Sequence, residues 1–482
     1  MFKPLLRPTR FYLTIGHLLL MVGAAAAAAT DFGQWAATPP MGWNSWDVYG
    51  SSVTEAEVKA NTDYMAQNLK QLGWEYVTVD IRWTDQAPGA HSYKIANPVL
   101  TLDNNGRFVP APNRFPSSAS GDGFKPLAGY VHAAGLKFGI HIMRGMPKLA
   151  HVATDALLKG YPIAGSSYFT LDVPTVSNGA WWLPDMVGIA KSEAGQAYYD
   201  SLFRLYASWG VDFVKVDDLD TTAGVYYQDE IDMIRAAIDK SGRPIVFSAS
   251  PGPVPLKDAD HICRQANMWR VANDFWDRWT DLVPQFERLN QWNSYRSAGH
   301  WPDADMLPLG HIAIRGEVGG DRMSKLSHDE QRTLMTLWCI ARSPLIFGGD
   351  LPTSDDWTKS LIANAEVIAV DQRSSDNRQL FRAGDKVSWI AEAPDGKGKY
   401  LALFNLNDTD AVQVAAKLSD LGFGGDVTIR DLWSHQDLGA FSGEFSPEIA
   451  SHGAGMYLIA PVPEARSSNH SIIGNGVLIG AN

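Results

Sequence analysis

The chain has 482 residues, of which 45% are hydrophobic and 20% are charged, and these proportions are typical of a soluble globular protein. Its formal net charge is −12, so it offers no overall basic character for binding nucleic acid or an anionic membrane surface. We therefore expect no nucleic-acid partner and no membrane partner. The length favours two domains over one.

The first 29 residues are predicted to be a signal peptide. Lys3, Arg7 and Arg10 form a basic start, an apolar segment follows, and the alanine run at 24–29 offers small residues for cleavage. We therefore expect a secreted or periplasmic protein. The competing interpretation is a membrane anchor, because the apolar segment is close to the length that spans a bilayer.

Residues 36–370 alternate between short apolar segments and helical patterns. The helices are predicted at 54–71, 124–134, 194–209, 227–240 and 328–341. The strands are predicted at 40–46, 76–80, 137–143, 212–217, 244–249, 268–272, just before 303, and at 344–349. Eight strands that alternate with helices predict an α/β fold, a (β/α)8 TIM barrel.

The pattern changes after residue 375. Short alternating strands are predicted at 386–393, 399–406, 412–418, 427–433 and 455–462. With the glycine-rich turns between them, they predict a C-terminal antiparallel β-sandwich domain over residues 376–462, and residues 463–482 are predicted to be a flexible tail. The two cysteines, Cys263 and Cys339, leave open whether a disulfide forms. Packing on the barrel is the expected role of the C-terminal domain, with polysaccharide binding as the alternative.

Acidic residues cluster where predicted barrel strands end, which is the edge that carries the active site in such barrels. Asp217 ends one strand, and Lys215 two residues earlier points to the same face and would favour the ionised carboxylate. Asp274 follows another strand, four residues after Arg270. Facing a cleft lined by Trp269 and Phe275, its carboxyl would hold a proton more readily.

Two carboxyl groups of this kind are what a glycosidase requires. In a retaining enzyme one attacks the sugar, and the other first donates and then accepts a proton. Asp217 suits the nucleophile, and Asp274 suits the acid/base. The alternative is structural, with both aspartates capping helices or pairing with Lys215 and Arg270.

Four motifs resemble glycoside hydrolase family 27, the α-galactosidase and α-N-acetylgalactosaminidase group. They are TPPMGWNSW at 38–46, VKVDD at 214–218, WRVAND at 269–274 and WPDADML at 301–307. The resemblance extends in order over nearly all of the chain after the leader. It implies a β/α barrel followed by an antiparallel β domain and a carbohydrate substrate. No cofactor is expected, because carboxyl chemistry suffices for such hydrolysis. A metal-dependent barrel hydrolase is a further alternative, but it needs clustered His ligands and no H-x-H occurs among the 12 His, so no metal is expected.

The resemblance also implies roles for single residues. The family's nucleophile and its preceding lysine fall on Asp217 and Lys215, and its acid/base falls on Asp274. The remaining correspondences are sugar contacts, and they fall on Trp46, Asp80 and Arg270.

Three positions depart from the α-galactosidase pattern. The second acidic residue that holds galactose hydroxyls is Ile81 here, a tyrosine is replaced by His141, and a glutamate that meets the 2-hydroxyl is replaced by Ser250. Ile81 removes a hydrogen-bond acceptor, and leaving a buried hydroxyl unpaired costs about 1–3 kcal/mol. A β-L-arabinopyranoside has the galactose ring configuration without the CH₂OH group.

We therefore expect an exported retaining exo-glycosidase, with α-galactosides ranked first. β-L-Arabinopyranosides, α-N-acetylgalactosaminides and dextran cleaved to isomaltose are the alternatives by the same mechanism. A catalytically inactive carbohydrate-binding protein is the alternative from another class, and the presence of both Asp217 and Asp274 argues against it. The sequence leaves the oligomeric state open.

Overall fold

A computed structural model describes residues 31–92, 98–176, 185–219, 225–250 and 252–462. The predicted signal peptide and the predicted C-terminal tail lie outside the described residues. Within the described ranges, no helix is both long and apolar enough to cross a bilayer.

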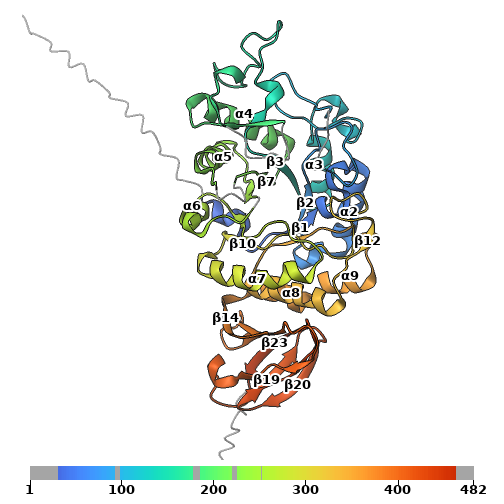
Figure 1. Ribbon diagram of the computed structural model, residues 1–482, viewed down its shortest axis with the longest axis vertical. Helices are drawn as coiled ribbons and strands as arrows, with labels where there is room; N and C mark the ends of the chain where they lie inside the picture. The colour runs from blue at the N-terminus through green and yellow to red at the C-terminus, as the bar shows by residue number, and fades with distance from the viewer. Residues whose placement is uncertain (1–30, 93–97, 177–184, 220–224, 251, 463–482) are drawn as a thin grey trace, which may run out of the picture. The chain divides into compact units, whose positions relative to one another are not determined.

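The first part of the chain forms a curved sheet of eight parallel strands, surrounded by helices (Figure 1). Each predicted barrel strand is present, and the prediction of a (β/α)8 barrel is confirmed. The order across the sheet is β10-β9-β8-β7-β3-β2-β1-β13. Their bounds are β1 (Met41–Asn44), β2 (Tyr76–Val79), β3 (Lys137–Met143), β7 (Phe213–Asp217), β8 (Val246–Ala249), β9 (Met268–Arg270), β10 (Trp301–Asp303) and β13 (Leu345–Phe347).

The two end strands of this sheet are joined through the residues that follow β10. Leu307 forms a parallel bridge with Phe347, and its N–H donates to the Ile346 carbonyl at 2.7 Å. The strands are almost wholly buried, which explains why they read as apolar segments rather than alternating ones.

The helices pack around the sheet, and several begin at caps that the sequence encodes. Ser327 and Glu330 form a capping box at the start of α8, and Thr54 and Glu57 form another at α2, so backbone N–H groups left free by the first turn are satisfied. The helices are α1 (Trp46–Tyr49), α2 (Glu55–Asn68), α3 (Lys125–Ala133), α4 (Glu193–Trp209), α5 (Gln228–Lys240), α6 (Ala259–Cys263), α7 (Trp279–Trp292), α8 (His328–Ala341), α9 (Asp356–Ile362) and α10 (Ala365–Arg373).

Short strands occur in two segments that connect barrel strands to helices. Between β3 and α4, the strands β4 (Met146–Pro147), β5 (Thr175–Val176) and β6 (Met186–Ile189) form a small antiparallel sheet. Between β10 and α8, β11 (His311–Ile312) pairs with β12 (Arg322–Met323). Both segments follow the carboxyl ends of barrel strands.

The C-terminal part is an antiparallel β structure, as predicted. Its main sheet has the order β14-β15-β16-β23-β19-β20. The predicted strand at 412–418 is two short strands that pair with different partners. The bounds are β14 (Ser375–Ala383), β15 (Lys386–Glu392), β16 (Lys399–Asn405), β17 (Val412–Gln413), β18 (Ala416–Lys417), β19 (Val427–Asp431), β20 (Gln436–Phe441), β21 (Glu444–Phe445), β22 (Glu448–Ile449) and β23 (Ala454–Pro461).

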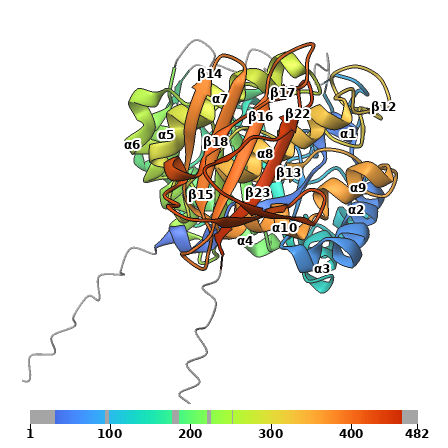
Figure 2. The same ribbon diagram turned by 90° about the horizontal axis from the view of Figure 1, so that it is seen from below.

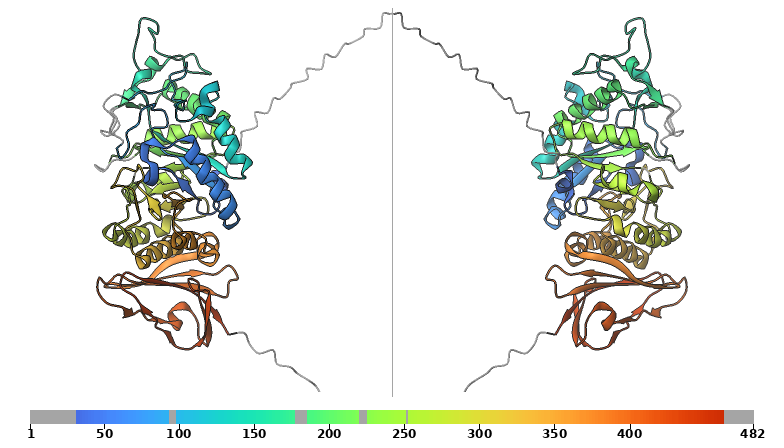
Figure 3. Two further views of the ribbon diagram at one scale, coloured as in Figure 1. Left: turned by 90° about the vertical axis from the view of Figure 1, so that its right-hand side faces the viewer. Right: turned by 90° about the vertical axis from the view of Figure 1, so that its left-hand side faces the viewer.

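Helices α7 and α8 pack against this sheet, as Figures 2 and 3 show. Phe286 of α7 meets Phe404 of β16 edge to face, with ring centroids 4.9 Å apart. Thr333 Oγ1 donates to the His452 carbonyl at 2.6 Å. Barrel and β-domain side chains therefore share one apolar core. Cys263 and Cys339 are free thiols, the second fully buried on α8.

Candidate active site

The carboxyl ends of neighbouring barrel strands bring most of the predicted site residues to one edge of the sheet. Asp80 directly follows β2, His141 lies on β3, and Lys215 and Asp217 lie on β7. Since β2, β3 and β7 are adjacent and in register, with His141 opposite Lys215 and Met143 opposite Asp217, their polar side chains converge on one site.

His141 lies between two aspartates. Its Nδ1 is 2.7 Å from Asp80 Oδ1, and its Nε2 is 3.1 Å from Asp217 Oδ2. The second contact is an ion-pair distance without the alignment of a good hydrogen bond. All three side chains are at most 9% exposed, so these charges interact with little screening by water.

The charge states of Asp80 and His141 follow from this arrangement. Burial opposes ionisation of Asp80, but the charges of His141 and Lys215 and the hydrogen bonds from His141 and Asn44 hold the pKa of Asp80 below its usual value. Burial likewise opposes protonation of His141, but the Asp80 charge and the contacts with both carboxylates raise the pKa of His141. The geometry therefore favours an imidazolium between two carboxylates.

Lys215 has a different partner from the one expected. The ion pair of Lys215 within the described ranges is with Asp80, Nζ to Oδ2 at 3.8 Å, rather than with Asp217. Burial opposes its charge, yet Asp80 and Asp305 raise the pKa of Lys215. The basic side chain that contacts Asp217 is therefore His141, which lies on the neighbouring strand β3 rather than on β7.

The backbone after Asp217 supports its carboxylate from the other side. Asp218 has a φ of 65°, a left-handed conformation that is uncommon outside glycine, and its N–H donates to Asp217 Oδ1 at 2.6 Å. Arg144 holds this turn, because its N–H donates to the Asp217 carbonyl at 3.0 Å and its Nε to the Asp218 carbonyl at 2.6 Å. Both carboxylate oxygens of Asp217 thus have defined neighbours.

Arg270, at the end of β9, connects Asp274 to a buried aspartate. Its Nη2 donates to Asp274 Oδ1 at 3.2 Å, and its Nη1 lies 2.8 Å from Asp305 Oδ1. Asp305 Oδ2 accepts the Phe275 N–H at 2.7 Å, which fixes the backbone beside Asp274. Burial raises the pKa of Asp305, and it raises the pKa of Asp303 to about 6.

The prediction that Trp269 and Phe275 line a cleft at Asp274 is wrong. Trp269 is fully buried and packs on Trp292, and Phe275 packs on Trp338. Both rings therefore belong to the apolar core. The Asp274 side chain is instead 65% exposed, which leaves its carboxyl accessible to a substrate and to water.

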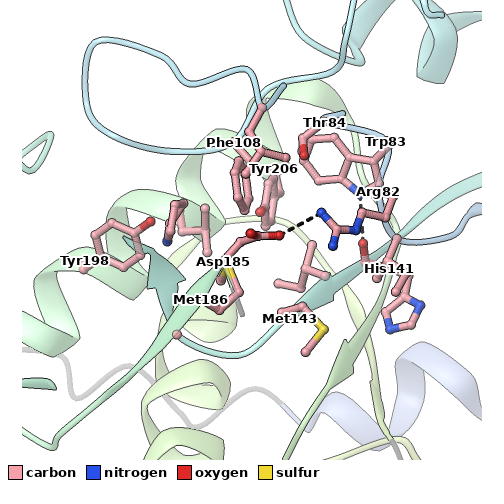
Figure 4. A pocket seen from close by; sticks show the side chains of 16 residues that line it. Arg82, Trp83, Thr84, Phe108, His141, Met143, Asp185, Met186, Tyr198 and Tyr206 are labelled. Carbon is pink, nitrogen blue, oxygen red and sulfur yellow. Dashed lines mark hydrogen bonds and ion pairs between the residues drawn. The ribbon is translucent and has the colours of Figure 1, made fainter. Parts of the chain in front are cut away.

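Ile81 belongs to a small apolar cluster with Met143 and Met186, and Trp46 and Phe108 pack against it. Ile81 is 4% exposed, and its N–H donates to Asp80 Oδ1 at 2.9 Å. Figure 4 shows the adjoining pocket, with Met143, Met186 and His141 around it. The wall beside Asp80 is therefore apolar.

Two further predicted residues have defined positions. Trp46 is the first residue of α1, directly after β1, and is partly buried. Ser250 follows β8 and is buried, and its N–H donates to the Val216 carbonyl at 2.8 Å, which ties β8 to β7 beside Asp217.

Sequence reasoning missed three contributors. Met143 could have been found, because it lies two residues after His141 on the same strand face. Asn44 Nδ2 donates to Asp80 Oδ2 at 2.8 Å, and it too follows from its place at the end of β1. Met186 carries no comparable signal, because it lies on a short strand in a connecting segment. Among the described residues, no group of three or more His, Cys, Asp or Glu side chains has the arrangement of a metal site.

Family profiles match most of the chain. A profile described as alpha galactosidase A matches residues 38–179 and 185–373, and one described as alpha galactosidase C-terminal beta sandwich domain matches residues 383–459. An α-galactosidase of Cyamopsis tetragonoloba is 32% identical over 431 residues, which are 88% of this chain and 86% of the relative.

Solved structures are also similar. A GH27 β-L-arabinopyranosidase variant from Geobacillus stearothermophilus in complex with arabinose is 48% identical, with a TM-score of 0.86, over 90% of this chain and all of that one. The wild-type enzyme is 47% identical with a TM-score of 0.85, over 93% of this chain and all of that one.

The chain therefore belongs to the α-galactosidase family, glycoside hydrolase family 27. It is a glycoside hydrolase, and its substrate is a carbohydrate.

Proposed function

We propose that the chain is a retaining exo-glycosidase with Asp217 as nucleophile and Asp274 as acid/base, and that it prefers terminal β-L-arabinopyranosides. The observation that carries the sugar preference is the apolar cluster of Ile81, Met143 and Met186 beside Asp80. The similarity to one β-L-arabinopyranosidase, at 48% and 47% identity to its two structures, supports it. This ranking differs from the one that the sequence motifs favoured, in which α-galactosides came first.

The contacts of Asp217 suit a nucleophile. A carboxylate that attacks an anomeric carbon must be ionised and held in place. The Asp218 N–H orients Oδ1 at 2.6 Å, and the His141 imidazolium faces Oδ2 at 3.1 Å. Attack forms a bond from Asp217 to C1 while the bond from C1 to the leaving oxygen breaks, which gives a covalent glycosyl-enzyme.

The position of Asp274 suits proton transfer. Its carboxyl is exposed and accepts from Arg270 at 3.2 Å, so it can reach a leaving group that departs toward solvent. In the first step it donates a proton to the leaving oxygen. In the second step it accepts a proton from the water that attacks C1 and releases Asp217.

Asp80 and Lys215 suit recognition of the sugar hydroxyls. Asp80 is an ionised acceptor beneath the site and Lys215 is a donor 3.8 Å from it, so together they can bind neighbouring ring hydroxyls. A galactose CH₂OH directed at Ile81 would find no acceptor there. At about 1–3 kcal/mol for an unpaired hydroxyl, the loss in kcat/KM relative to an arabinopyranoside is roughly five- to 150-fold.

The test is hydrolysis of 4-nitrophenyl glycosides by the unaltered chain and by Asp217→Gly. The panel holds β-L-arabinopyranoside, α-D-galactoside, α-N-acetylgalactosaminide and α-glucoside, with dextran alongside. We expect the highest kcat/KM on the arabinopyranoside, and NMR of the first product should show the anomeric configuration of the substrate. Asp217→Gly should lose at least about a thousandfold in kcat.

Azide supplies the control for the nucleophile. In Asp217→Gly it can enter the vacated space, attack C1 and give a glycosyl azide of inverted configuration, which a merely misfolded variant would not do. A product of inverted configuration from the unaltered chain would contradict the retaining mechanism. Best activity on the α-galactoside would contradict the sugar preference alone.

Export is proposed on separate grounds. The basic start and apolar segment within residues 1–29 support a cleaved leader. N-terminal sequencing of the protein recovered from the periplasm or medium should begin near residue 30. Full-length protein retained in the membrane fraction would favour the anchor instead.

A further inference from the structure

A buried ion pair lies in the apolar pocket beside the proposed sugar site. Arg82 Nη1 is 2.8 Å from Asp185 Oδ2, and the two side chains are 4% and 17% exposed. Figure 4 shows this pair in the pocket, with Met143, Met186 and Phe108 around it. Its two members are 103 residues apart in the sequence.

The Arg82 end of the pair is fixed by the backbone. Arg82 has a φ of 69°, a conformation that persists for a residue with a side chain only where its surroundings impose it. Its carbonyl accepts from Arg114 Nη1 at 2.7 Å and from the Asp85 N–H at 3.0 Å. Arg82 also directly follows Ile81, so its position is tied to that of the specificity residue.

The Asp185 end leads into the apolar cluster. The Asp185 carbonyl accepts the Lys148 N–H at 2.7 Å, and the next residue, Met186, begins β6 and pairs with Pro147. Met186 is 4% exposed and packs with Ile81 and Met143. The ion pair therefore joins the residue after Ile81 to the residue before Met186.

Stability alone does not account for such a pair. Removing two charges from water is costly, and apolar residues of similar volume often serve stability as well or better. The charges do specify one arrangement, because in an apolar pocket Asp185 accepts few alternatives to Arg82. Arg82 Nη1 also lies 3.9 Å from Oδ2 of buried Asp85, which helps to hold the guanidinium in place.

We infer that the Arg82–Asp185 ion pair determines substrate specificity by holding Met186 against Ile81. The inference deepens the proposed function and depends on it. Fixed in this way, the wall beside Asp80 presents apolar side chains and no acceptor to a CH₂OH group on the sugar. Arg82 and Asp185 act as positioning residues, because they work through Met186 rather than by contact with the reacting atoms.

The test compares the ratio of kcat/KM for 4-nitrophenyl β-L-arabinopyranoside to that for the α-D-galactopyranoside. In Arg82→Met and in Asp185→Asn the ratio should fall roughly tenfold, the lower end of the discrimination that a small group gives in a pocket. The fall should come from a lower KM for the galactoside. Arg82→Lys retains a charge opposite Asp185 and should keep most of the ratio.

Two further variants separate positioning from general damage. The double variant Arg82→Met/Asp185→Asn should show the same ratio as either single variant, because the ratio depends on the pair as one unit. Its stability should follow that of Arg82→Met, which also removes the contact with Asp85. Asp229→Asn breaks an exposed ion pair with Lys191 and should leave the ratio unchanged. The Asp229 side chain is 65% exposed and the Lys191 side chain 57%. Met186→Ala should lower the ratio without touching the ion pair, and it tests the same wall if the charge variants fail to fold.

The outcomes are distinguishable from failure of the proposed function. An unaltered chain that cleaves neither glycoside would overturn both. Cleavage of both glycosides by the unaltered chain, with the same ratio in Arg82→Met, Asp185→Asn and Met186→Ala, would overturn this inference alone. Equal losses on both glycosides would also overturn it, because they would show a structural role only.

Discussion

His141 on β3 faces Asp217 on the neighbouring strand β7, with Nε2 3.1 Å from Oδ2. The other ring nitrogen is committed to Asp80 at 2.7 Å, so the imidazole cannot turn away from Asp217 without losing that contact. The proposed sugar ligand Asp80 and the proposed nucleophile Asp217 are thereby connected through one ring. The geometry places His141 directly beside the proposed nucleophile.

Replacing His141 by Ala should lower kcat with little change in KM. The loss should be on the order of a hundredfold, which is typical when one preorganised donor is removed from a reacting group. His141→Tyr restores an uncharged donor and should recover part of the loss. Steady-state kinetics on the arabinopyranoside measure both, and a change confined to KM would contradict a role at Asp217.

The pH dependence of stability should report the charge state of the His141 imidazole. The pKa of His141 is raised in the folded protein. Its contribution to the free energy of unfolding is therefore fully present below the unfolded-state pKa of about 6.5 and is lost as pH rises through the folded-state pKa. The pKa of Asp80 is lowered, so its contribution is present above about 3.9 and is lost as pH falls.

The difference in Tm between the unaltered chain and His141→Gln should therefore be largest between about pH 4 and 6.5 and shrink at higher pH. Calorimetry from pH 4 to 9 measures it. His151→Gln is the matched control, because its ring contacts the Thr170 carbonyl rather than a carboxylate. A difference that does not change with pH would contradict an imidazolium at position 141.

The barrel could be predicted because buried parallel strands have an unambiguous pattern. Runs such as Leu345–Phe347 are apolar on both faces, and helices separate the strands at regular intervals. Helix α7 was missed because Pro284 lies inside it, and proline ordinarily argues against a helix interior. Strand β20 was missed because its residues are largely exposed and contain Gly439, so no apolar alternation marks it.

The site could be predicted only as far as strand ends define it. Asp80, His141, Asp217 and Arg270 all lie at or next to barrel strands, and barrel topology brings such positions together. The partner of a side chain is not encoded in this way. Lys215 pairs with Asp80 on another element, and nothing local in the sequence connects Asp185 to Arg82 across 103 residues.

Substitution of Asp274 should affect substrates according to their leaving group. Asp274→Ala removes the proposed proton donor, so a substrate with a poor leaving group should lose about a hundred- to ten-thousandfold in kcat/KM. The 2,4-dinitrophenolate group departs without protonation, so a 2,4-dinitrophenyl glycoside should lose far less in kcat/KM. Asp229→Asn serves as the control carboxylate, and equal losses on both substrates would argue against acid catalysis by Asp274.

Ile81→Asp should shift activity toward α-galactosides. The new carboxylate offers the acceptor that a galactose CH₂OH otherwise lacks there, worth roughly five- to 150-fold in relative kcat/KM. A second charge beside buried Asp80 should also lower Tm, since like charges in a buried site repel. Ile81→Val keeps the wall apolar and should keep the preference. An unchanged preference in Ile81→Asp would mean that this wall does not face the sugar.

The contact between α7 and the β domain should contribute strongly to stability. Phe286 is fully buried against Phe404, so Phe286→Ala leaves a cavity where barrel and β domain meet. We expect a loss of about 3–5 kcal/mol in the free energy of unfolding, measured by denaturant unfolding. Leu438→Ala, at a position that is 39% exposed, should cost much less.

Because Phe286 is not among the proposed catalytic residues, kcat of the folded Phe286→Ala variant should stay near that of the unaltered chain. A small stability loss would mean that the β domain is only loosely attached to α7.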